Sequence, residues 1–409
     1  MNCRHCQTPL HPTNDVFLDL GSAPPSNAFL RACDLDKAEA HLPLKVFSCT
    51  NCRLVQVDEI ERHDSLFSDD YVYFSSYSST WVAHAERYVR WAIDRLELNV
   101  RSLVVEVASN DGYLLQFVNA RGIPCVGIEP TAGTAQAARE RGIESIGEFF
   151  GEQFATEFAA TRRQADLVIG NNVLAHVPDI NDFVAGFQVI LAPNGAVTVE
   201  FPHLLQLVQQ GQFDTVYHEH LCYHSVKSLR SFFAQHGLQL IDARRIPTKG
   251  GSLRGTVQLA GGPRDVSSEV GRLLEWETLA RLHSLDTFRA YSRRIDTAKE
   301  QFTSLLDRCR ATGKVIAGYG ASPTVTTLID QFDIADRLDF LVDDNPVKQN
   351  TFSPGHQLPV YPSEAIYERE ADVVAVLAWQ YAGPITAKHR KFSEGGGRFV
   401  VPLPQLQIS

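Results

Sequence analysis

The hydrophobic pattern in the middle of the chain alternates between short apolar runs and segments with helical periodicity. The run 103–108 is typical of a buried parallel strand; a Ser-Asn-Asp-Gly turn and a helical spacing follow it. A second run at 125–128 ends in Glu-Pro. Strand, helix and strand in this order predict a βαβ unit. Later runs of the same kind, at 165–170 and 196–200, extend the prediction to a doubly wound α/β sheet.

The same alternation returns in the C-terminal part of the chain. A long helical pattern over 267–310 leads to a second strand and turn at 315–323. Two later runs resemble further strands of this sheet, 338–342 and 373–378. Taken alone, the Gly-x-Gly of the turn and the downstream Asp343 suggest a dinucleotide site, although Pro323 stands at the third glycine position.

Four of the eight cysteines form two Cys-x-x-Cys pairs, Cys3 with Cys6 and Cys49 with Cys52. Each pair can form a knuckle that directs two thiolates at one tetrahedral Zn²⁺, and a closed Cys₄ shell leaves no position for water. We therefore predict a structural zinc site in a small module that needs its metal to fold. His5 could replace one ligand, and a redox dithiol is the alternative, but no βαβ pattern surrounds the pairs.

Composition narrows the class of protein. The chain has 409 residues, 44% of them hydrophobic and 21% charged, which fits a soluble protein of two or three domains. A net charge of -10 argues against nucleic acid or an anionic membrane as the main partner. No apolar run approaches the roughly 20 residues that span a bilayer, and the N-terminus lacks a signal-peptide core. We expect a cytoplasmic protein whose oligomeric state, a monomer included, the sequence leaves open.

The segment 217–224 places three imidazoles, two phenols, a carboxylate and a thiol in eight residues. Histidine titrates near neutrality, so this density favours either proton transfer or metal binding. The spacing is not the His-Glu-x-x-His pattern of zinc hydrolases, and the cysteines already supply a complete zinc shell. Acid–base chemistry is therefore the preferred interpretation, with a metal site and an exposed polar strand edge as alternatives.

The carboxyl edge of the central sheet has the residues of a nucleoside site. Glu129 ends the second predicted strand, where a carboxylate can accept hydrogen bonds from both ribose hydroxyls. The first turn, 109–112, lacks the glycine cradle that a pyrophosphate requires. A nucleoside without a diphosphate fits better, and S-adenosylmethionine is such a ligand. Methyl transfer is thus favoured over hydride transfer, with a Rossmann-like scaffold that binds no nucleoside as the alternative.

Together these motifs resemble the S-adenosylmethionine-dependent sugar C-methyltransferases that act on nucleotide-linked ketosugars, and most closely the deoxysugar 3-C-methyltransferases. The resemblance covers nearly the whole chain. It rests on the two cysteine pairs and on the segments 106–112, 127–130, 171–179, 217–220, 250–254 and 318–321. It implies a zinc-binding domain at 1–70, a methyltransferase domain at 71–245 and a Rossmann-like sugar-nucleotide domain at 246–409.

The resemblance also implies a mechanism and its residues. A base removes a proton from the carbon next to the ketone, the enolate oxygen is stabilised, and the carbon attacks the sulfonium methyl in line. His220 is the expected general base, Tyr217 and His176 position the keto group or stabilise its enolate, and Glu219 orients a neighbour. His176 could instead only cap the turn before a proline. An aromatic residue ahead of the methyltransferase domain is expected to contribute, with Tyr71 the first choice.

The same resemblance suggests two sets of binding residues. The expected contacts to S-adenosylmethionine are Glu106, Ser109, Asn110, Asp111, Gly112, Glu129, Pro130, Asn171 and Asn172. The expected contacts to the sugar nucleotide are Lys249, Arg254, Tyr73 and Tyr319. Of these, the first two can hold a diphosphate, although a hairpin with solvated charges is the alternative. Family members often carry a lysine after the Gly-Ala turn, where this chain has Thr324, so that anion contact is absent.

Two other functions remain open from the sequence. One is an NAD-dependent nucleotide-sugar oxidoreductase that uses the C-terminal domain, and the other is a non-enzymatic zinc-dependent interaction protein. The sequence does not specify the nucleotide sugar, the methylated carbon or the stereochemical outcome.

Overall fold

The computed structural model describes residues 1–58 and 74–409. Tyr71 and Tyr73 therefore lie outside the described residues. The chain forms two compact units, each built from several stretches of sequence. The first contains Met1–His11, Cys49–His203 and Leu221–Ala280, and the second contains Pro12–Ser48, Leu204–His220 and Arg281–Ser409. Each unit has its own sheet and its own core.

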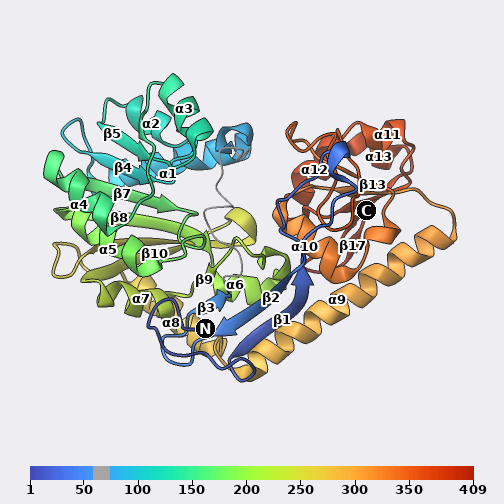
Figure 1. Ribbon diagram of the computed structural model, residues 1–409, viewed down its shortest axis with the longest axis horizontal. Helices are drawn as coiled ribbons and strands as arrows, with labels where there is room; N and C mark the ends of the chain where they lie inside the picture. The colour runs from blue at the N-terminus through green and yellow to red at the C-terminus, as the bar shows by residue number, and fades with distance from the viewer. Residues whose placement is uncertain (59–73) are drawn as a thin grey trace. The chain divides into compact units, whose positions relative to one another are not determined.

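The first unit is built on a seven-stranded sheet with the order β10-β11-β8-β7-β4-β5-β6 (Figure 1). Its parallel strands are β4 (Val104–Val107), β5 (Cys125–Ile128), β6 (Glu144–Ile146), β7 (Ala165–Asn171) and β8 (Leu191–Pro202). Two antiparallel strands extend it, β10 (Leu238–Ile246) and β11 (Ser252–Leu259). The chain reverses its direction of growth between β4 and β7, which confirms the predicted doubly wound sheet. Ligands of such sheets bind outside the carboxyl ends of the strands at this reversal.

Helices complete the first unit. They are α1 (Ser79–Leu96), α2 (Leu115–Asn119), α3 (Ala132–Glu140), α4 (Glu152–Thr161), α5 (Ile180–Ile190), α7 (Val226–Gln235) and α8 (Ser268–Leu279). Helix α1 begins where the side chain of Ser78 accepts a hydrogen bond from the Trp81 N–H, and it ends at Glu97, whose φ is 56°. It buries Tyr88 and Ala92 against apolar side chains of β4 and β7. This packing holds α1 on the central sheet.

The cysteine knuckles lie in the first unit. Cys3 and Cys6 belong to Met1–His11, and Cys49 and Cys52 precede the short strand β3 (Val55–Val57). Strand β3 pairs antiparallel with β9 (Cys222–Tyr223). Within the histidine-rich segment 217–224, Cys222 and Tyr223 are the residues that form a strand.

The second unit is built on a six-stranded sheet with the order β14-β13-β12-β15-β16-β17. Five strands are parallel and the last is antiparallel: β12 (Ile316–Tyr319), β13 (Phe340–Val342), β14 (Val360–Tyr361), β15 (Val373–Val376), β16 (Arg398–Val401) and β17 (Gln407–Ile408). This is the predicted second Rossmann-like sheet. The order reverses between β12 and β15.

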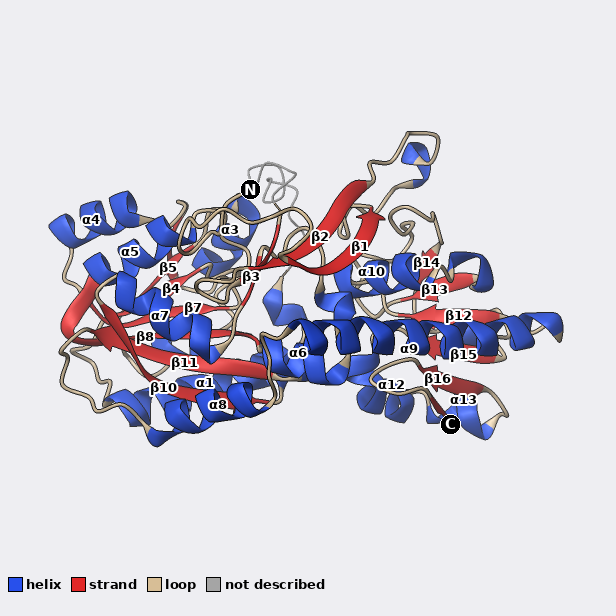
Figure 2. Ribbon diagram, turned by 90° about the horizontal axis from the view of Figure 1, so that it is seen from below, coloured by secondary structure: helices blue, strands red, loops and turns tan. Residues whose placement is uncertain are grey.

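The helices of the second unit are α6 (Leu204–Gln210), α9 (Leu285–Ala311), α10 (Pro323–Phe332), α11 (Ala365–Glu368), α12 (Ala382–Lys388) and α13 (Arg390–Glu394). In Figure 2 the long helix α9 runs across the C-terminal sheet. A hairpin of β1 (Val16–Ala23) and β2 (Leu42–Ser48) packs on it, with the Phe17 and Phe288 rings 4.3 Å apart. Among the described residues, no helix has both the length and the apolarity needed to cross a membrane.

The single long helical pattern expected over 267–310 is wrong in one respect, because the structure divides it into α8 and α9. Arg281 has a left-handed φ of 51°, which stops α8. Ser284 then begins α9, since its side chain accepts a hydrogen bond from the Thr287 N–H at 3.2 Å. The sequence has helical periodicity on both sides of the break, so periodicity alone did not reveal that α8 ends and α9 begins there.

Candidate functional site

The turn after β4 has an unusual backbone. Ala108, Asn110 and Gly112 all have left-handed φ angles, of 54°, 50° and 75°. Two of them are not glycine, and such residues in this region carry strain that the surrounding structure must offset. A side chain at Gly127, on the neighbouring strand β5, would collide with Ser109. The turn after β4 therefore packs closely against β5 at the carboxyl edge of the sheet.

Glu129 follows β5 and faces this turn. Its side chain is 5% exposed; one carboxylate oxygen accepts from the Asn110 N–H at 2.9 Å and the other from the Thr131 N–H at 3.0 Å. Each carboxylate oxygen has a further acceptor position. The carboxylate is thus held in a fixed orientation and still has the capacity to receive hydroxyl groups.

Several buried polar atoms near this edge have no hydrogen-bond partner among the described residues. Native structures pair nearly all such atoms, so a group of them indicates a ligand position. They are Glu106 Oε2, Ser109 Oγ, Asp111 Oδ1, Thr131 Oγ1, Asn171 Oδ1 and Asn172 Nδ2. Burial, together with the nearby charges of Glu129 and Asp111, raises the pKa of Glu106 well above its usual value. These donors and acceptors fit the adenosine and amino-acid groups of S-adenosylmethionine.

Residues that the sequence analysis missed cover the same turn. The Ser75 N–H donates to Asn110 Oδ1 at 2.9 Å, and the Ser76 N–H donates to Asp111 Oδ2 at 3.3 Å. Arg141, just after α3, lies 2.8 Å from the same Asp111 oxygen and also donates to Ser76 Oγ at 2.9 Å. No motif marks this arginine, because its role depends only on where α3 ends.

The loop after β7 carries His176. The Asn172 N–H donates to the Glu200 carbonyl at 2.7 Å, and the Ala175 carbonyl accepts from the Leu221 N–H at 2.7 Å. His176 is half-buried, and its backbone N–H closes a turn onto the Val173 carbonyl. The cap of α5 is Asp179, whose side chain accepts from the Asp182 N–H. The imidazole of His176 is therefore not the residue that caps this helix.

A buried charge cluster adjoins β8 and was not predicted. Glu200, 1% exposed, lies 2.8 Å from His84 Nε2 and accepts from Arg254 Nε at 2.6 Å. Burial raises the pKa of Glu200, but the hydrogen bond from His84 and the charge of Arg254 bring it below its usual value. Arg254 also lies over the rings of Tyr88 and Trp91, at 4.8 and 4.6 Å. The Arg254 guanidinium thus already has a partner within the protein, Glu200. The proposed contact of Arg254 with a diphosphate stays a prediction.

Lys249 lies in the turn between β10 and β11. Its ammonium is 5.2 Å from the ring centre of Trp81, and burial lowers its pKa to about 8. The residue has a left-handed φ of 50°. The expected contact of Lys249 with a diphosphate stays a prediction.

Tyr217 and His220, in the second unit, form the predicted pair. Tyr217 Oη lies 2.7 Å from His220 Nε2, and His220 Nδ1 lies 2.8 Å from the Thr215 carbonyl oxygen. A carbonyl can only accept, so this contact assigns the proton to Nδ1 and makes Nε2 the acceptor for the Tyr217 hydroxyl. The two side chains are 8% and 7% exposed. An imidazole with a basic Nε2 is the form that a general base requires.

The other residues of this segment take different positions. Glu219 is half-buried, and its negative charge opposes the lowering of the Lys348 pKa by burial. His218 Nε2 lies 3.2 Å from the Pro43 carbonyl oxygen, which is a structural contact. His224 is fully buried in the first unit.

Asp214 is a buried carboxylate in the turn that precedes Tyr217. It is 1% exposed, and its Oδ2 accepts from the Trp379 indole N–H at 2.7 Å. Burial raises its pKa to about 7, although the hydrogen bond from Trp379 opposes the change.

Replacing Asp214 with Asn should remove a pH dependence of stability. The pKa of Asp214 is about 7 in the folded protein and returns to ~4 on unfolding, so the folded state binds more protons between these values. Its contribution to the free energy of unfolding is complete below pH ~4 and is lost as pH rises through about 7. Denaturant unfolding at several pH values checks this. The matched control is Asp372→Asn, directly before β15, which should keep the slope of the parent. An unchanged slope in D214N would contradict the prediction.

Tyr319 ends β12 and is 3% exposed. Its hydroxyl donates to Asp344 Oδ2 at 3.0 Å and lies 3.1 Å from His389 Nε2. Asp343, the carboxylate that suggested a dinucleotide site, accepts from the Ala321 and Asn345 N–H groups at 2.6 and 2.7 Å. It therefore stabilises its own turn.

The four knuckle cysteines come together as predicted. Their sulfur atoms all lie within 4.8 Å of one another, with Cys3 and Cys52 at 3.4 Å and Cys6 and Cys49 at 3.6 Å. Zinc–sulfur bonds of about 2.3 Å in a tetrahedron place sulfur atoms at such separations. His5, the alternative ligand, instead stacks on Phe232 with ring centres 3.7 Å apart. The structure therefore has a tetracysteine zinc-binding site.

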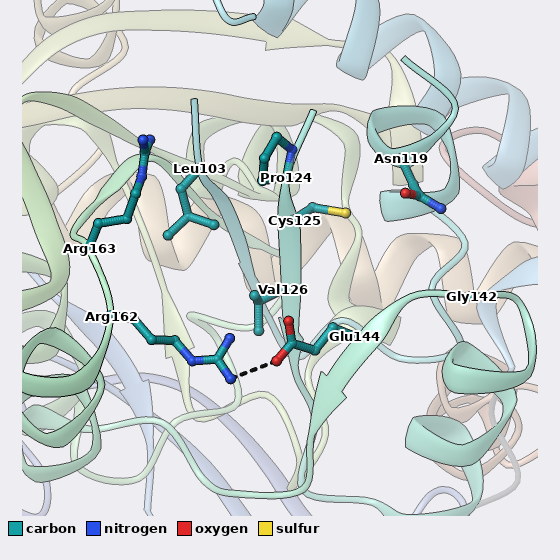
Figure 3. Close-up of a pocket in the computed structure, with 9 residues that line it drawn as sticks. All are labelled: Leu103, Asn119, Pro124, Cys125, Val126, Gly142, Glu144, Arg162 and Arg163. Atoms are coloured by element: carbon teal, nitrogen blue, oxygen red, sulfur yellow. Dashed lines mark hydrogen bonds and ion pairs between the residues drawn. The ribbon is translucent and has the colours of Figure 1, made fainter. Parts of the chain in front are cut away.

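A surface pocket of about 400 Å³ lies at the opposite end of the central strands (Figure 3). It is lined by residues at the amino ends of β4, β5 and β6 and before β7: Leu103, Asn119, Pro124, Cys125, Val126, Gly142, Glu144, Arg162 and Arg163. The Arg162 guanidinium is bound to Glu144 at 2.6 Å. This pocket is separate from the edge that carries the candidate cofactor residues.

Three protein-family models match successive parts of the chain. A putative zinc-binding domain matches residues 3–67, a methyltransferase domain matches 81–243, and a C-methyltransferase C-terminal domain matches 247–404. Among solved structures, the chain is similar to magnesium protoporphyrin IX methyltransferase of Synechocystis, with 13% identity over 43% of this chain and 82% of that one and a TM-score of 0.34. The PH0226 protein of Pyrococcus horikoshii is 14% identical over 46% and 94%, with a TM-score of 0.37.

A curated relative matches the whole chain. C-methyltransferase NovU of Streptomyces niveus is 32% identical over 410 residues, which cover 99% of this chain and 96% of the relative. The match includes the cysteine knuckles, both sheets and the segment that carries Tyr217 and His220. With its tetracysteine site and its S-adenosylmethionine-binding fold, the chain belongs to the C-methyltransferase family of this relative.

Proposed function

We propose that the protein methylates a carbon adjacent to a ketone in a nucleotide-linked deoxyketosugar. The observation that carries this proposal is the Tyr217–His220 pair, in which the Thr215 carbonyl keeps the proton on Nδ1 and Nε2 is the basic nitrogen. A carbon acid next to a ketone needs a base of this kind, and a hydroxyl group nearby can stabilise the enolate.

When bound, S-adenosylmethionine supplies an electrophilic methyl group and is left as S-adenosylhomocysteine. The residues of this chain have three proposed tasks. His220 Nε2 takes the proton from the carbon next to the ketone. The Tyr217 hydroxyl, which donates to Nε2 when no sugar is present, donates to the oxygen as it gains negative charge. His176 helps to orient the sugar. The carbon that His220 deprotonates would then take the methyl group, and the electron pair of the broken carbon–sulfur bond would remain on sulfur.

The charge and the position of three side chains support their proposed contacts with the substrate. Lys249 offers an ammonium to a diphosphate, whereas Arg254 is tied to Glu200 at 2.6 Å and contributes less. Tyr319 is bonded to Asp344, so its hydroxyl is oriented at the carboxyl edge of the C-terminal sheet. Tyr71 and Tyr73 keep their proposed place near the sugar, on the evidence of the sequence alone.

The decisive experiment incubates the protein with S-adenosylmethionine and a panel of nucleotide-linked ketosugars. A product heavier by one methylene, formed together with S-adenosylhomocysteine, supports the proposal. A second reaction in deuterium oxide, with S-adenosylhomocysteine in place of the methyl donor, isolates proton abstraction. Deuterium should enter at the carbon next to the ketone. A panel without any methylated product would reject the sugar substrate.

Glu129→Gln should weaken the binding of S-adenosylmethionine by about 10- to 100-fold, because a charged acceptor for the ribose hydroxyls is lost. Isothermal titration calorimetry measures this change. Glu157→Ala is the matched control, since Glu157 is an exposed residue of α4 whose carboxylate accepts from the Gln153 side chain. Equal affinities of E129Q and the parent would place the ribose elsewhere.

An NAD-dependent reaction of the C-terminal unit has less support. Asp343 already accepts two backbone N–H groups, and Pro323 begins α10 where a third glycine would stand. Thermal unfolding with and without NAD(H) separates the two functions, because a bound ligand raises the melting temperature.

A further inference from the structure

The orientation of His220 depends on a short turn that precedes it. The 3₁₀ turn Phe213–Thr215 ends with the carbonyl that accepts the His220 Nδ1 proton. Any rotation of this carbonyl would allow the proton to move to Nε2, and the basic nitrogen would then point away from Tyr217. The groups that hold the turn therefore control which nitrogen of His220 is basic.

Asp214 occupies the centre of this turn and binds a residue distant in sequence. Its Oδ2 accepts from the Trp379 indole N–H at 2.7 Å, and both side chains are buried, at 1% and 7% exposure. Trp379 begins the turn Trp379–Tyr381, shortly after β15. The hydrogen bond thus connects the base-bearing segment to the carboxyl edge of the C-terminal sheet, within the same unit.

Helix α10 holds the two ends of the turn. The Phe213 and Phe332 rings are stacked with centres 4.9 Å apart, and the Thr327 hydroxyl donates to the Val216 carbonyl at 3.3 Å. Both contacts constrain the chain on either side of Asp214. The peptide that contains the Thr215 carbonyl is also held from within the turn, because the Val216 N–H donates to the Phe213 carbonyl at 2.9 Å. The Trp379 contact adds an anchor from outside the turn.

A carboxylate is a costly choice at this position. Burial of a charged group is unfavourable unless it is well hydrogen-bonded, and an apolar side chain of similar size would pack without that cost. Asp214 Oδ1 has no partner among the described residues, whereas Oδ2 accepts from the Trp379 indole N–H. Hydrogen bonding by the backbone N–H groups of Asp214 and Thr215 also favours the charged form of the carboxylate. The buried indole N–H of Trp379 needs an acceptor, and Asp214 Oδ2 supplies it.

We propose that Asp214 and Trp379 are positioning residues for His220. Their hydrogen bond fixes the Phe213–Thr215 turn, the turn directs the Thr215 carbonyl at Nδ1, and Nε2 remains the basic nitrogen. The role of His220 as base rests on the proposed function, whereas the hydrogen-bonded arrangement does not.

The test uses the full-length protein and Trp379→Phe, which removes the donor and keeps an aromatic ring. Nitrogen NMR of ¹⁵N-histidine-labelled protein reports the tautomer of His220, whose signals are assigned by their loss in His220→Asn. The parent should show the Nδ1-protonated form, and W379F a mixture of both. With an accepted sugar, W379F should lower kcat by about tenfold with KM little changed, because the base is misplaced while the sugar contacts persist.

Two further variants separate positioning from packing. Asp214→Asn keeps an oxygen acceptor for the indole N–H and should retain the parent tautomer and at least half of kcat. Asp214→Ala loses the acceptor and should behave as W379F does. Trp276→Phe is the matched control, because it makes the same substitution in α8, remote from the turn in sequence and in the other unit.

The outcomes are distinct. A single Nδ1-protonated tautomer and parental kcat in folded W379F would overturn the proposal. Failure of W379F to fold would also overturn it, since the indole would then serve packing. If the parent methylates none of the sugars, the proposed function fails, but the tautomer measurement still decides this inference.

Discussion

Replacing His220 with Asn should lower the rate of methyl transfer by about 10²- to 10⁴-fold while binding of S-adenosylmethionine is unchanged. This range is the usual contribution of a positioned general base. Asparagine has no basic nitrogen, so proton removal would depend on water or on Tyr217. Single-turnover rates with an accepted ketosugar measure the loss, and deuterium incorporation with S-adenosylhomocysteine should fall in parallel.

The matched control for this variant is His218→Asn. His218 lies two residues away and contacts backbone carbonyls of residues 42 and 43, so its loss should affect stability more than rate. Tyr217→Phe should produce a smaller loss of rate, since it removes the hydroxyl that lies 2.7 Å from Nε2 but leaves the base in place. Deuterium exchange at the parental rate in H220N would show that another group is the base.

Removal of zinc should unfold the N-terminal knuckles and inactivate the enzyme. Structural zinc sites contribute about 10–16 kcal/mol of apparent binding free energy in zinc-finger peptides, and that energy is folding energy. Metal analysis should find one zinc ion per chain. Cys49→Ser should lose the metal and lower the melting temperature, whereas Cys33→Ser should change neither, because Cys33 is an exposed free cysteine.

The effect of zinc on activity should be indirect. Arg4, within the first knuckle, donates to the Pro178 carbonyl at 2.8 Å, and its own carbonyl accepts from Asn181 at 2.5 Å. His5 stacks on Phe232 of α7. Unfolding of the knuckle on loss of zinc should therefore disturb the loop that carries His176. Chelation should abolish methyl transfer, and added Zn²⁺ should restore it; full activity and stability without metal would contradict this account.

The central strands of both sheets were predictable because they are buried on two faces, whereas the short or outer strands β6, β10, β11, β14, β16 and β17 were not predicted. Parallel strands covered by helices read as nearly continuous apolar runs, as at Val373–Val376 and, apart from Glu106, at Val104–Val107. The zinc site was predictable for a different reason. Two residues between cysteines place both sulfur atoms on one knuckle, so the local spacing already contains most of the geometry.

The charge cluster around Glu200 was not predictable. Arg254 is its register partner on β11, and His84 reaches it from α1, so the cluster requires contacts over 54 and 116 residues. His84 and Glu200 form no motif with their sequence neighbours, and the segment 250–254 that contains Arg254 does not indicate its partner. Only the pairing of β8 with β11 and the packing of α1 bring the charges together.

The sequence by itself determined the α/β class, the two Rossmann-like sheets, the tetracysteine zinc site and the choice of Tyr217 and His220, which lie within hydrogen-bond distance of each other. These features depend on local spacing and on the period of hydrophobic side chains. The tertiary structure alone decided the tautomer of His220, the pairing of Asp214 with Trp379, and the internal contacts of Arg254 and Asp343. Each of these depends on which distant backbone or side-chain group completes a buried hydrogen bond. A buried polar group without such a partner is energetically unfavourable, so the fold must supply one.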